Sequence, residues 1–213
     1  MSKLVGKVLL EGTRLTHKTD LAFALNEHPR FVGPRRYRYH SPVVSGEWCG
    51  FTNHPWGRGL INYDPTSEHD LAMATYATWA DLFGHLRYYT WIVDRFHVST
   101  QCWQKLHHGR DVDFRWLEDG LGPLGFRIAL CVRRPETFAA AREQRLPVSG
   151  NPSQYDDLDV FRREQDLLRE LVNRSSLMAL EVDVSDDDVA AACERLVDWY
   201  EVTGGLHLPD TGH

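Results

Sequence analysis

The chain has 213 residues, of which 42% are hydrophobic and 25% are charged, and its formal net charge is −6. This length and composition are typical of a globular protein with one sizeable core, so we expect a single domain over residues 1–213. The acidic balance argues against a general binder of nucleic acid polymers. No long uncharged apolar run or signal peptide is evident, so we expect no membrane contact and a cytoplasmic location.

Cysteine and histidine spacing gives no support for a metal framework. The eleven histidines form no His-x-x-x-His or Cys/His pattern. The four cysteines lie far apart with no CxxC pair, and we expect free thiols in a reducing compartment, at Cys49, Cys102, Cys131 and Cys193.

The stretch from Lys7 to Leu25 predicts a strand, a loop and a helix. An apolar run at Val8–Leu10 is followed by a turn over Gly12–Thr19, and apolar residues then recur at helical spacing. The turn matches seven of the eight positions of G-x-x-x-x-G-K-[ST], the phosphate-binding P-loop pattern. His17 stands where that pattern has its second glycine.

A P-loop binds phosphate through inward-pointing backbone N–H groups and the positive end of the following helix. Lys18 would neutralise the outer phosphates of ATP, and the Thr19 hydroxyl would be a ligand of Mg²⁺. The alternative is an ordinary strand-to-helix turn with an exposed lysine. The residues expected to bind the nucleotide are Gly12, Thr13, Arg14, Leu15, Thr16, His17, Lys18 and Thr19.

His17 is a departure from the pattern and not a candidate catalytic histidine. Glycine at this position adopts backbone torsions that are closed to most other residues. The imidazole must therefore point either outward or into the nucleotide site. It marks either a variant phosphate-binding loop or one that has lost its function.

The next segment predicts a second strand and a long loop. Arg and Tyr alternate towards the end of Phe31–His40, which would place Arg36 and Arg38 on one face of a strand. Residues 41–65 have no clear periodicity, so we expect a functional loop at an acceptor site. Its aromatic residues would either form a wall for a flat ring together with Arg58 or seal the loop onto the core; they are Trp48, Phe51, Trp56 and Tyr63.

A helix capped by Thr66 or Ser67 should follow, with one face formed by Leu71, Thr75, Trp79, Leu82, Phe83 and Leu86. The apolar run Tyr89–Val93 then predicts a buried strand that ends in Asp94 and Arg95. A strand buried on both faces that delivers an acid and a base at its carboxyl end is typical of α/β active sites.

The remaining chain continues the alternation of strands and helices. We expect strands at Phe126–Val132 and Leu177–Val184, a helix that carries Arg142 and Arg145 at its end, a mobile loop over Pro147–Asp157, a helix over Val160–Val172, and a final helix capped by Ser185. This order implies a parallel sheet flanked by helices.

At this point the residues resemble the P-loop nucleotide and nucleoside kinases, in particular thymidylate kinase-like and deoxynucleoside kinase-like proteins. LLEGTRLTHKT is similar to their LEGxxGxGKT loop, VDRFHVS to their DR[YF]xxS segment, and RPETFAAAREQR to their PExxxxRxxxR run before a lid. The resemblance implies an α/β fold of the P-loop NTPase type, a three-layer sandwich with a mostly parallel central sheet and a lid over residues 142–157.

The resemblance also implies roles in a kinase that uses ATP and Mg²⁺. Asp94 would assist the metal or the acceptor hydroxyl, and Arg95 would orient the acceptor or its phosphate. Arg142 and Arg145 would close over the transferring phosphoryl group, where Lys18 also acts. The alternatives are an Asp94–Arg95 ion pair and an exposed helix face for the two later arginines.

One departure concerns the acceptor. The family usually has an acidic base at the end of the second strand, where this chain offers Arg35, Arg36, Arg38 and His40, with Glu47 further on. Cationic residues suit an anionic small-molecule acceptor, although a solvated basic strand edge is equally consistent. The expected acceptor contacts are Arg36, Arg38, Trp48, Trp56, Arg58 and Arg95.

Three functions therefore stay open. The first is a kinase that transfers the γ-phosphate of ATP to a nucleotide, nucleoside or related acceptor, with a homodimer as one open form of assembly. The second is a specialised P-loop transferase or hydrolase acting on a natural product, and the third is a non-catalytic nucleotide-binding protein with a degenerate P-loop.

Overall fold

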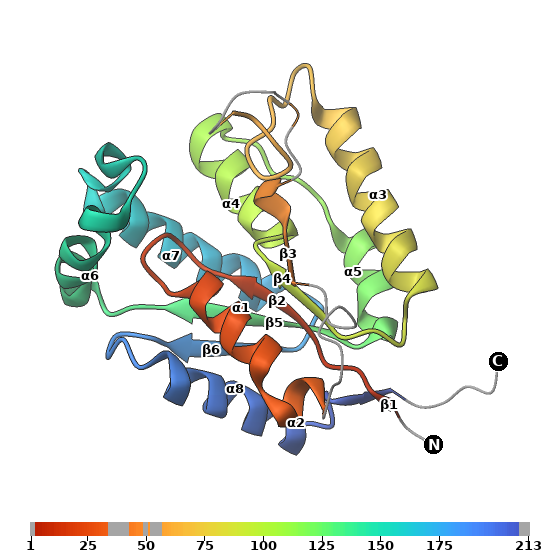
Figure 1. Cartoon of the computed structure of the whole chain (residues 1–213). Coiled ribbons are helices and arrows are strands. Elements are labelled where there is room, and N and C mark those ends of the chain that lie inside the picture. The colour runs from red at the N-terminus through yellow and green to blue at the C-terminus, as the bar shows by residue number, and fades with distance from the viewer. Residues whose placement is uncertain (1–2, 34–42, 49–50, 52–56, 209–213) are drawn as a thin grey trace.

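The computed structural model describes residues 3–33, 43–48, 51 and 57–208. Its centre is a five-stranded sheet in which all the paired strands are parallel, with the order β3-β4-β2-β5-β6 (Figure 1). The strands are β2 (Lys7–Glu11), β3 (Val43–Ser45), β4 (Trp91–Asp94), β5 (Phe126–Val132) and β6 (Ala179–Asp183). The expected parallel α/β sheet is confirmed.

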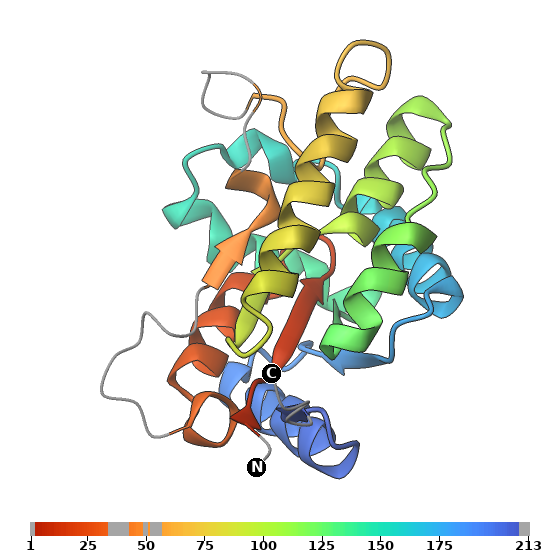
Figure 2. The same ribbon diagram turned by 90° about the vertical axis from the view of Figure 1, so that its right-hand side faces the viewer.

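Helices cover both faces of this sheet. One face carries α1 (Lys18–Glu27), α2 (Pro29–Val32) and α8 (Val189–Val202). The other carries α3 (His69–His85), α4 (His97–His108), α5 (Arg115–Leu121) and α7 (Leu158–Arg174). Figure 2 shows α3, α4 and α5 side by side over that second face. Helix α6 (Phe138–Arg145) follows β5 beyond the carboxyl end of that strand.

Short elements complete the chain. A separate two-stranded antiparallel sheet joins β1 (Lys3–Leu4) to β7 (His207–Leu208). The 3-10 helices are η2 (Gly46–Trp48), η3 (Gly122–Leu124), η4 (Pro135–Thr137), η5 (Leu146–Val148) and η6 (Pro152–Tyr155). No helix in the described part of the chain has the length and apolar character needed to cross a membrane.

The three central strands are mostly apolar, as expected for strands with both faces covered, and nearly all of their residues are buried. Alternate residues of β2 face opposite helix layers, so that Leu9 packs towards α4 and α5 whereas Leu10 packs towards α1 and α8. The register pairs Leu10 with Asp94 and Glu11 with Leu130. The carboxyl ends of β2 and β4 therefore lie side by side, directly before the two segments that carry the candidate site.

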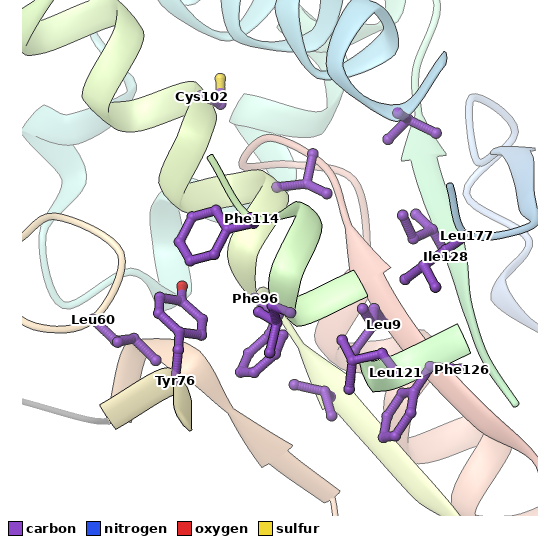
Figure 3. Packing of buried hydrophobic residues seen from close by; sticks show 14 of the residues in the cluster. Leu9, Leu60, Tyr76, Phe96, Cys102, Phe114, Leu121, Phe126, Ile128 and Leu177 are labelled. Carbon is purple, nitrogen blue, oxygen red and sulfur yellow. The ribbon is translucent and has the colours of Figure 1, made fainter. Parts of the chain in front are cut away.

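An aromatic cluster fixes α4 against the sheet (Figure 3). The Tyr76 ring packs edge-on against Phe96 and Phe114, with ring centroids 4.9 and 4.6 Å apart, and its hydroxyl lies 2.6 Å from the Thr100 Oγ1. Burial of each such side chain contributes about 1.5–3 kcal/mol to the free energy of unfolding. The start of α4, which follows Asp94 and Arg95, is thereby held in a fixed position.

The prediction of a second strand over Phe31–His40 is wrong at its first two residues. Phe31 and Val32 belong to α2, which begins at Pro29 because proline fits the first turn of a helix. The strand of the sheet comes later, at Val43–Ser45, inside the segment expected to be a loop. Arg36 and Arg38 lie outside the described residues.

Two expected helix starts differ from the structure. The residue that precedes α3 is Glu68, and neither Thr66 nor Ser67 caps the helix. The final helix begins after Asp188, whose side chain accepts a hydrogen bond from the Ala191 amide. Ser185 instead donates its hydroxyl to Asp183, because an aspartate two residues earlier is in reach of a local turn.

The apolar face expected on α3 is only partly confirmed: Trp79 and Leu86 pack half-buried against the core, but both leucines earlier on that face are exposed. Leu71 is 53% exposed and Leu82 is 39% exposed. Of the six residues, Phe83 alone is fully buried, and it shares the inner face with Ala72 and Tyr76. The larger aromatic side chains bury more apolar area than leucine, which explains why this face packs against the core.

Candidate active site

The loop between β2 and α1 begins at a glycine that the fold requires. Gly12 has a φ of 146°, and a Cβ atom there would lie 2.6 Å from the Cys131 carbonyl oxygen of the neighbouring strand. A side chain at this position would therefore collide with β5 as well as strain the backbone.

Two residues of the loop other than glycine adopt left-handed torsions. They are Leu15, with a φ of 66°, and His17, with φ and ψ of 52° and 22°. Such torsions cost of order 1–3 kcal/mol each, so the surroundings must hold these residues in place. His17 thus keeps the backbone turn that glycine would give, and it leads directly into α1.

Lys18 is the first residue of α1, and its side chain is buried inside the loop. Its Nζ donates a hydrogen bond of 2.7 Å to the Thr13 carbonyl oxygen, to which the Thr16 hydroxyl also donates. Burial lowers the pKa of Lys18, while the nearby Asp94 carboxylate works in the opposite direction. The ammonium group therefore lies within the loop, where a phosphate group could replace the carbonyl as its partner.

Thr19 meets Asp94 next to this lysine. The Thr19 hydroxyl donates a hydrogen bond of 2.6 Å to Asp94 Oδ2. The other carboxylate oxygen, Oδ1, is buried and has no hydrogen-bond partner among the residues that the structure describes. A hydroxyl and a free carboxylate oxygen are hard ligands that suit Mg²⁺, which usually completes its shell with waters and substrate phosphates.

Arg95 is buried with a φ of 61°, immediately after β4. Its Nη1 pairs with the Glu47 carboxylate, and its Nε donates to the Ser99 hydroxyl at 3.2 Å. The alternative interpretation, an Asp94–Arg95 ion pair, is not found, because Arg95 faces Glu47 and Ser99 instead. This arrangement places a paired cation and carboxylate beside the Lys18–Asp94 cluster.

Glu47 occupies the position where an acceptor base is expected. It follows β3 in the short helix η2, and the preceding Gly46 amide donates to the Arg95 carbonyl oxygen at 3.1 Å. A Cβ atom at Gly46 would lie 2.4 Å from that oxygen, so glycine permits the close approach. The sequence predicted a strand end near His40, with Glu47 only as an acid further along the chain.

The electrostatic setting keeps Glu47 ionised. Burial acts to raise the pKa of Glu47, but the charges of Arg95, Lys18 and Arg14 outweigh it, so that the pKa lies below its usual value. Arg14 is the predicted nucleotide-binding residue whose charge acts on this carboxylate. The Glu47 carboxylate therefore stays charged at neutral pH.

Two further buried carboxylates, Glu11 and Glu164, connect parts of the site to neighbouring helices. Glu11 accepts hydrogen bonds from the Phe96 amide at 3.0 Å and from the Ser99 hydroxyl, and burial raises the pKa of Glu11. Glu164 of α7 accepts from the Thr13 hydroxyl. The first joins the end of β2 to α4, and the second joins the phosphate-binding loop to α7.

The predicted lid arginines contact the lid itself. Arg142 Nε donates to the Tyr155 carbonyl oxygen at 2.9 Å, and Arg145 Nε lies 3.4 Å from the Tyr155 hydroxyl oxygen. The ring of Tyr155 packs in a small apolar cluster with Phe138, against which Leu15 of the phosphate-binding loop packs. The segment expected to be a mobile loop, Pro147–Asp157, thus contains η6 and part of η5, and the arginines of the preceding α6 contact Tyr155 and not Lys18.

The expected aromatic wall is not assembled among the described residues. Tyr63 is fully buried in the main core and Phe51 packs against that core. Arg58 pairs with Glu68, with Nε lying 3.0 Å from both carboxylate oxygens. Trp48 ends η2, and Trp56 lies outside the described residues. Of the two alternatives for the aromatic residues, Phe51 and Tyr63 therefore follow the second: they pack the loop onto the core.

Several solved structures have a similar fold. Thymidylate kinase from Candida albicans matches with a TM-score of 0.61 and 15% identity, covering 99% of this chain and 97% of that one. The YorR protein from Bacillus subtilis, solved in complex with phosphorylated GDP, matches with a TM-score of 0.59 and 18% identity over 92% and 98% of the two chains. The fold is that of the P-loop nucleotide kinases.

A third structure supports the same assignment of the P-loop kinase fold. Thymidylate kinase from Ehrlichia chaffeensis matches with a TM-score of 0.57 and 13% identity, covering 92% of this chain and 98% of that one. No protein-family model matches the sequence, and no curated protein matches it significantly. The chain therefore shares its fold over nearly its whole length with nucleotide kinases to which its sequence similarity is low.

Proposed function

We propose that the protein is a small-molecule kinase that transfers the γ-phosphate of ATP to a nucleotide, nucleoside or related acceptor. The observation that carries this proposal is the contact of Thr19 with Asp94, 2.6 Å long, beside the buried Lys18. In P-loop kinases of this kind, catalysis consists mainly of positioning and of neutralising charge on the phosphates. These three side chains have the chemistry for that task.

On the donor side, the loop over Gly12–His17 and the start of α1 would bind the phosphates through backbone N–H groups. Lys18 would exchange its bond to the Thr13 carbonyl oxygen for one to a phosphate oxygen. Thr19 and the free oxygen of Asp94 would hold Mg²⁺, which neutralises phosphate charge when it is bound.

On the acceptor side, Glu47 is the proposed general base. The acceptor hydroxyl would give its proton to the Glu47 carboxylate as its oxygen forms a bond to the γ-phosphorus and the bond to ADP breaks. Arg95 holds this carboxylate and supports its ionised form. The same arginine would balance the negative charge that gathers on the transferring group.

The acceptor class rests on two features. Glu47 requires a hydroxyl or similar proton-bearing group, and Arg14 and Arg95 supply positive charge beside it. Two of the similar structures are thymidylate kinases by their names. A nucleoside, whose hydroxyl carries the proton that Glu47 would accept, is therefore the first acceptor to test. A nucleoside monophosphate, which those names suggest, is the second: its attacking phosphate oxygen is largely deprotonated at neutral pH, so its transfer would not need Glu47 as a base.

The proposal is tested by assaying transfer of labelled γ-phosphate from ATP with Mg²⁺ to a panel of nucleosides and nucleoside monophosphates. We expect a labelled product from at least one acceptor and none from Lys18→Ala. Lys105→Ala is the matched control, because Lys105 of α4 lies at the surface, where it forms an exposed ion pair with Asp111. If no acceptor is labelled although ATP binds, the protein is a nucleotide-binding protein and not a kinase of this acceptor class.

A further inference from the structure

Asp187 links its own segment of the chain to three others, one of which is the phosphate-binding loop. It lies between β6 and α8, and its Oδ1 is 3.0 Å from His17 Nε2 and also pairs with Arg133 Nη2. Its other oxygen, Oδ2, accepts a hydrogen bond of 3.3 Å from Gln144 Nε2 on α6. One carboxylate thus contacts the loop, the end of β5 and the helix that begins the lid.

Arg133 extends this connection to a second strained residue. Its side chain is fully buried, and its Nε donates to the Leu15 carbonyl oxygen at 2.9 Å. Its backbone amide and carbonyl pair with the Gln165 side chain at 2.7 and 2.8 Å, which fixes its position. Asp187 therefore contacts His17 directly and is linked to Leu15 through Arg133.

The residues that meet here share an unusual backbone. Leu15, His17 and Asp187 have φ values of 66°, 52° and 59°, although none of them is glycine. Such torsions persist in proteins where the surroundings over-determine them, and they concentrate at functional sites. In this chain, hydrogen bonds that converge on one carboxylate supply that constraint, at the position where a P-loop ordinarily has a glycine.

The ring of His17 lies between two carboxylates. Nδ1 lies 2.8 Å from Asp20 Oδ2, and Nε2 lies 3.0 Å from Asp187 Oδ1. These two contacts, at different nitrogens of the ring, fix the orientation of the imidazole. The charged groups around the ring are Asp20 of α1, Asp187, and Arg133 on the far side of Asp187.

We propose that Asp187 is a positioning residue for the phosphate-binding loop. Through His17 and Arg133 it holds the two left-handed residues in the geometry that binds phosphate, and through Gln144 it couples that geometry to the lid helix. The inference rests on the proposed function, because it assigns the loop to nucleotide phosphates.

A double-mutant cycle on ATP affinity, measured by calorimetry with Mg²⁺, tests this inference. We expect Asp187→Asn to weaken ATP binding by about tenfold, which equals 1.4 kcal/mol. In the background of His17→Gly, glycine adopts the left-handed torsions by itself, so the same change should cost clearly less. Asp186→Asn, an exposed neighbour, is the matched control and should leave affinity unchanged.

If Asp187→Asn costs the same affinity in both backgrounds, or costs nothing, the inference is overturned. If Asp187→Asn does not fold, His17→Ala decides, because it removes the ring that Asp187 contacts and does not gain the backbone freedom of glycine. An ATP affinity of His17→Ala equal to that of wild type would overturn the inference.

A readout without nucleotide keeps this inference distinct from the proposed function. In the free protein, Asp187→Asn should speed hydrogen exchange at the amides of residues 13–17, and Asp186→Asn should not. Faster exchange in a protein whose wild type binds no ATP would uphold the positioning role while the kinase proposal fails. Unchanged exchange would overturn the positioning role whether or not ATP binds.

Discussion

Thr19 and Asp94 are 75 positions apart in the chain, yet a hydrogen bond of 2.6 Å joins them. The parallel register, which pairs Leu10 with Asp94, sets the end of β4 beside the start of α1. The bond leaves Asp94 Oδ1 buried and without a partner among the described residues. Burying a carboxylate oxygen without a hydrogen-bond partner costs free energy, and a bound cation would offset that cost.

Asp94 should matter for chemistry more than for stability. Asp94→Asn keeps the shape of the side chain and removes its charge, so we expect kcat to fall on the order of 10²–10³-fold, as when one electrostatic group of an active site is removed. The melting temperature should change little, which differential scanning calorimetry measures. Asp111→Asn on the surface is the control, and a large loss of stability with unchanged turnover would assign Asp94 a structural role instead.

Glu47 should act as a base. Glu47→Gln removes proton acceptance while keeping size, so kcat should fall by about 10²–10⁴-fold with a smaller change in KM. The lowered pKa of Glu47 means that its carboxylate stays ionised through the ordinary titration range of glutamate. Wild-type kcat should therefore hold until the pH falls below that range, as steady-state rates between pH 4 and 8 would show. Equal kcat in the two proteins would remove Glu47 from the chemistry.

Lys7 should lower stability near neutral pH. Burial, and then the charge of Arg87, lower the pKa of Lys7 to about 7, and its Nζ donates to the Arg87 carbonyl oxygen at 2.7 Å. Between pH 7 and 9 the unfolded chain holds a proton on this lysine that the folded chain lacks. The free energy of unfolding should therefore rise with pH, by up to about 1.4 kcal/mol per unit from this group.

Lys7→Met should remove that slope, because methionine fills a similar space and carries no proton. Urea denaturation of both proteins at pH 6, 7, 8 and 9 measures it. Lys105→Met, at an exposed lysine, should keep the wild-type slope. An identical pH dependence in wild type and Lys7→Met would show that Lys7 is charged in the folded protein at neutral pH.

The lid should rearrange when both substrates bind. Arg142 and Arg145 contact Tyr155 in this structure, so closing over a phosphoryl group requires them to exchange that partner. We expect hydrogen exchange over residues 146–157 to change with ATP, Mg²⁺ and acceptor together, as in other lids. Arg142→Ala should lower kcat by about 10³-fold or more if this arginine supplies transition-state charge. Unchanged kcat, with faster exchange of the free lid, would limit Arg142 to holding Tyr155.

The sequence predicted those parts of the molecule whose cause is local. Strand β5 was predicted with its observed bounds because both of its faces are buried, and the glycine, lysine and threonine of the first loop are local signals. Contacts between distant segments gave no such signal. Glu47, Asp187 and Glu164 meet the loop or Arg95 only after the sheet has formed, and nothing in their flanking residues indicates it.

His17 illustrates the same limit. From the sequence, its imidazole could point outward or towards the nucleotide. The choice depends on which groups elsewhere in the chain contact the ring, and the flanking residues do not reveal them. The structure directs the ring to Asp20 and Asp187, 3 and 170 positions away along the chain. The departure from the P-loop pattern is thereby accommodated, and the left-handed torsion expected of glycine is kept.

The central claim is that the loop over Gly12–Thr19 binds ATP through Lys18. Calorimetric titration of ATP and Mg²⁺ into wild type and Lys18→Ala tests it most directly, with melting temperatures checked so that both proteins are folded. We predict saturable binding by the wild type and an affinity loss of at least about tenfold, or 1.4 kcal/mol, in the variant. Equal affinity in the two proteins, or no binding by the folded wild type, would contradict the account.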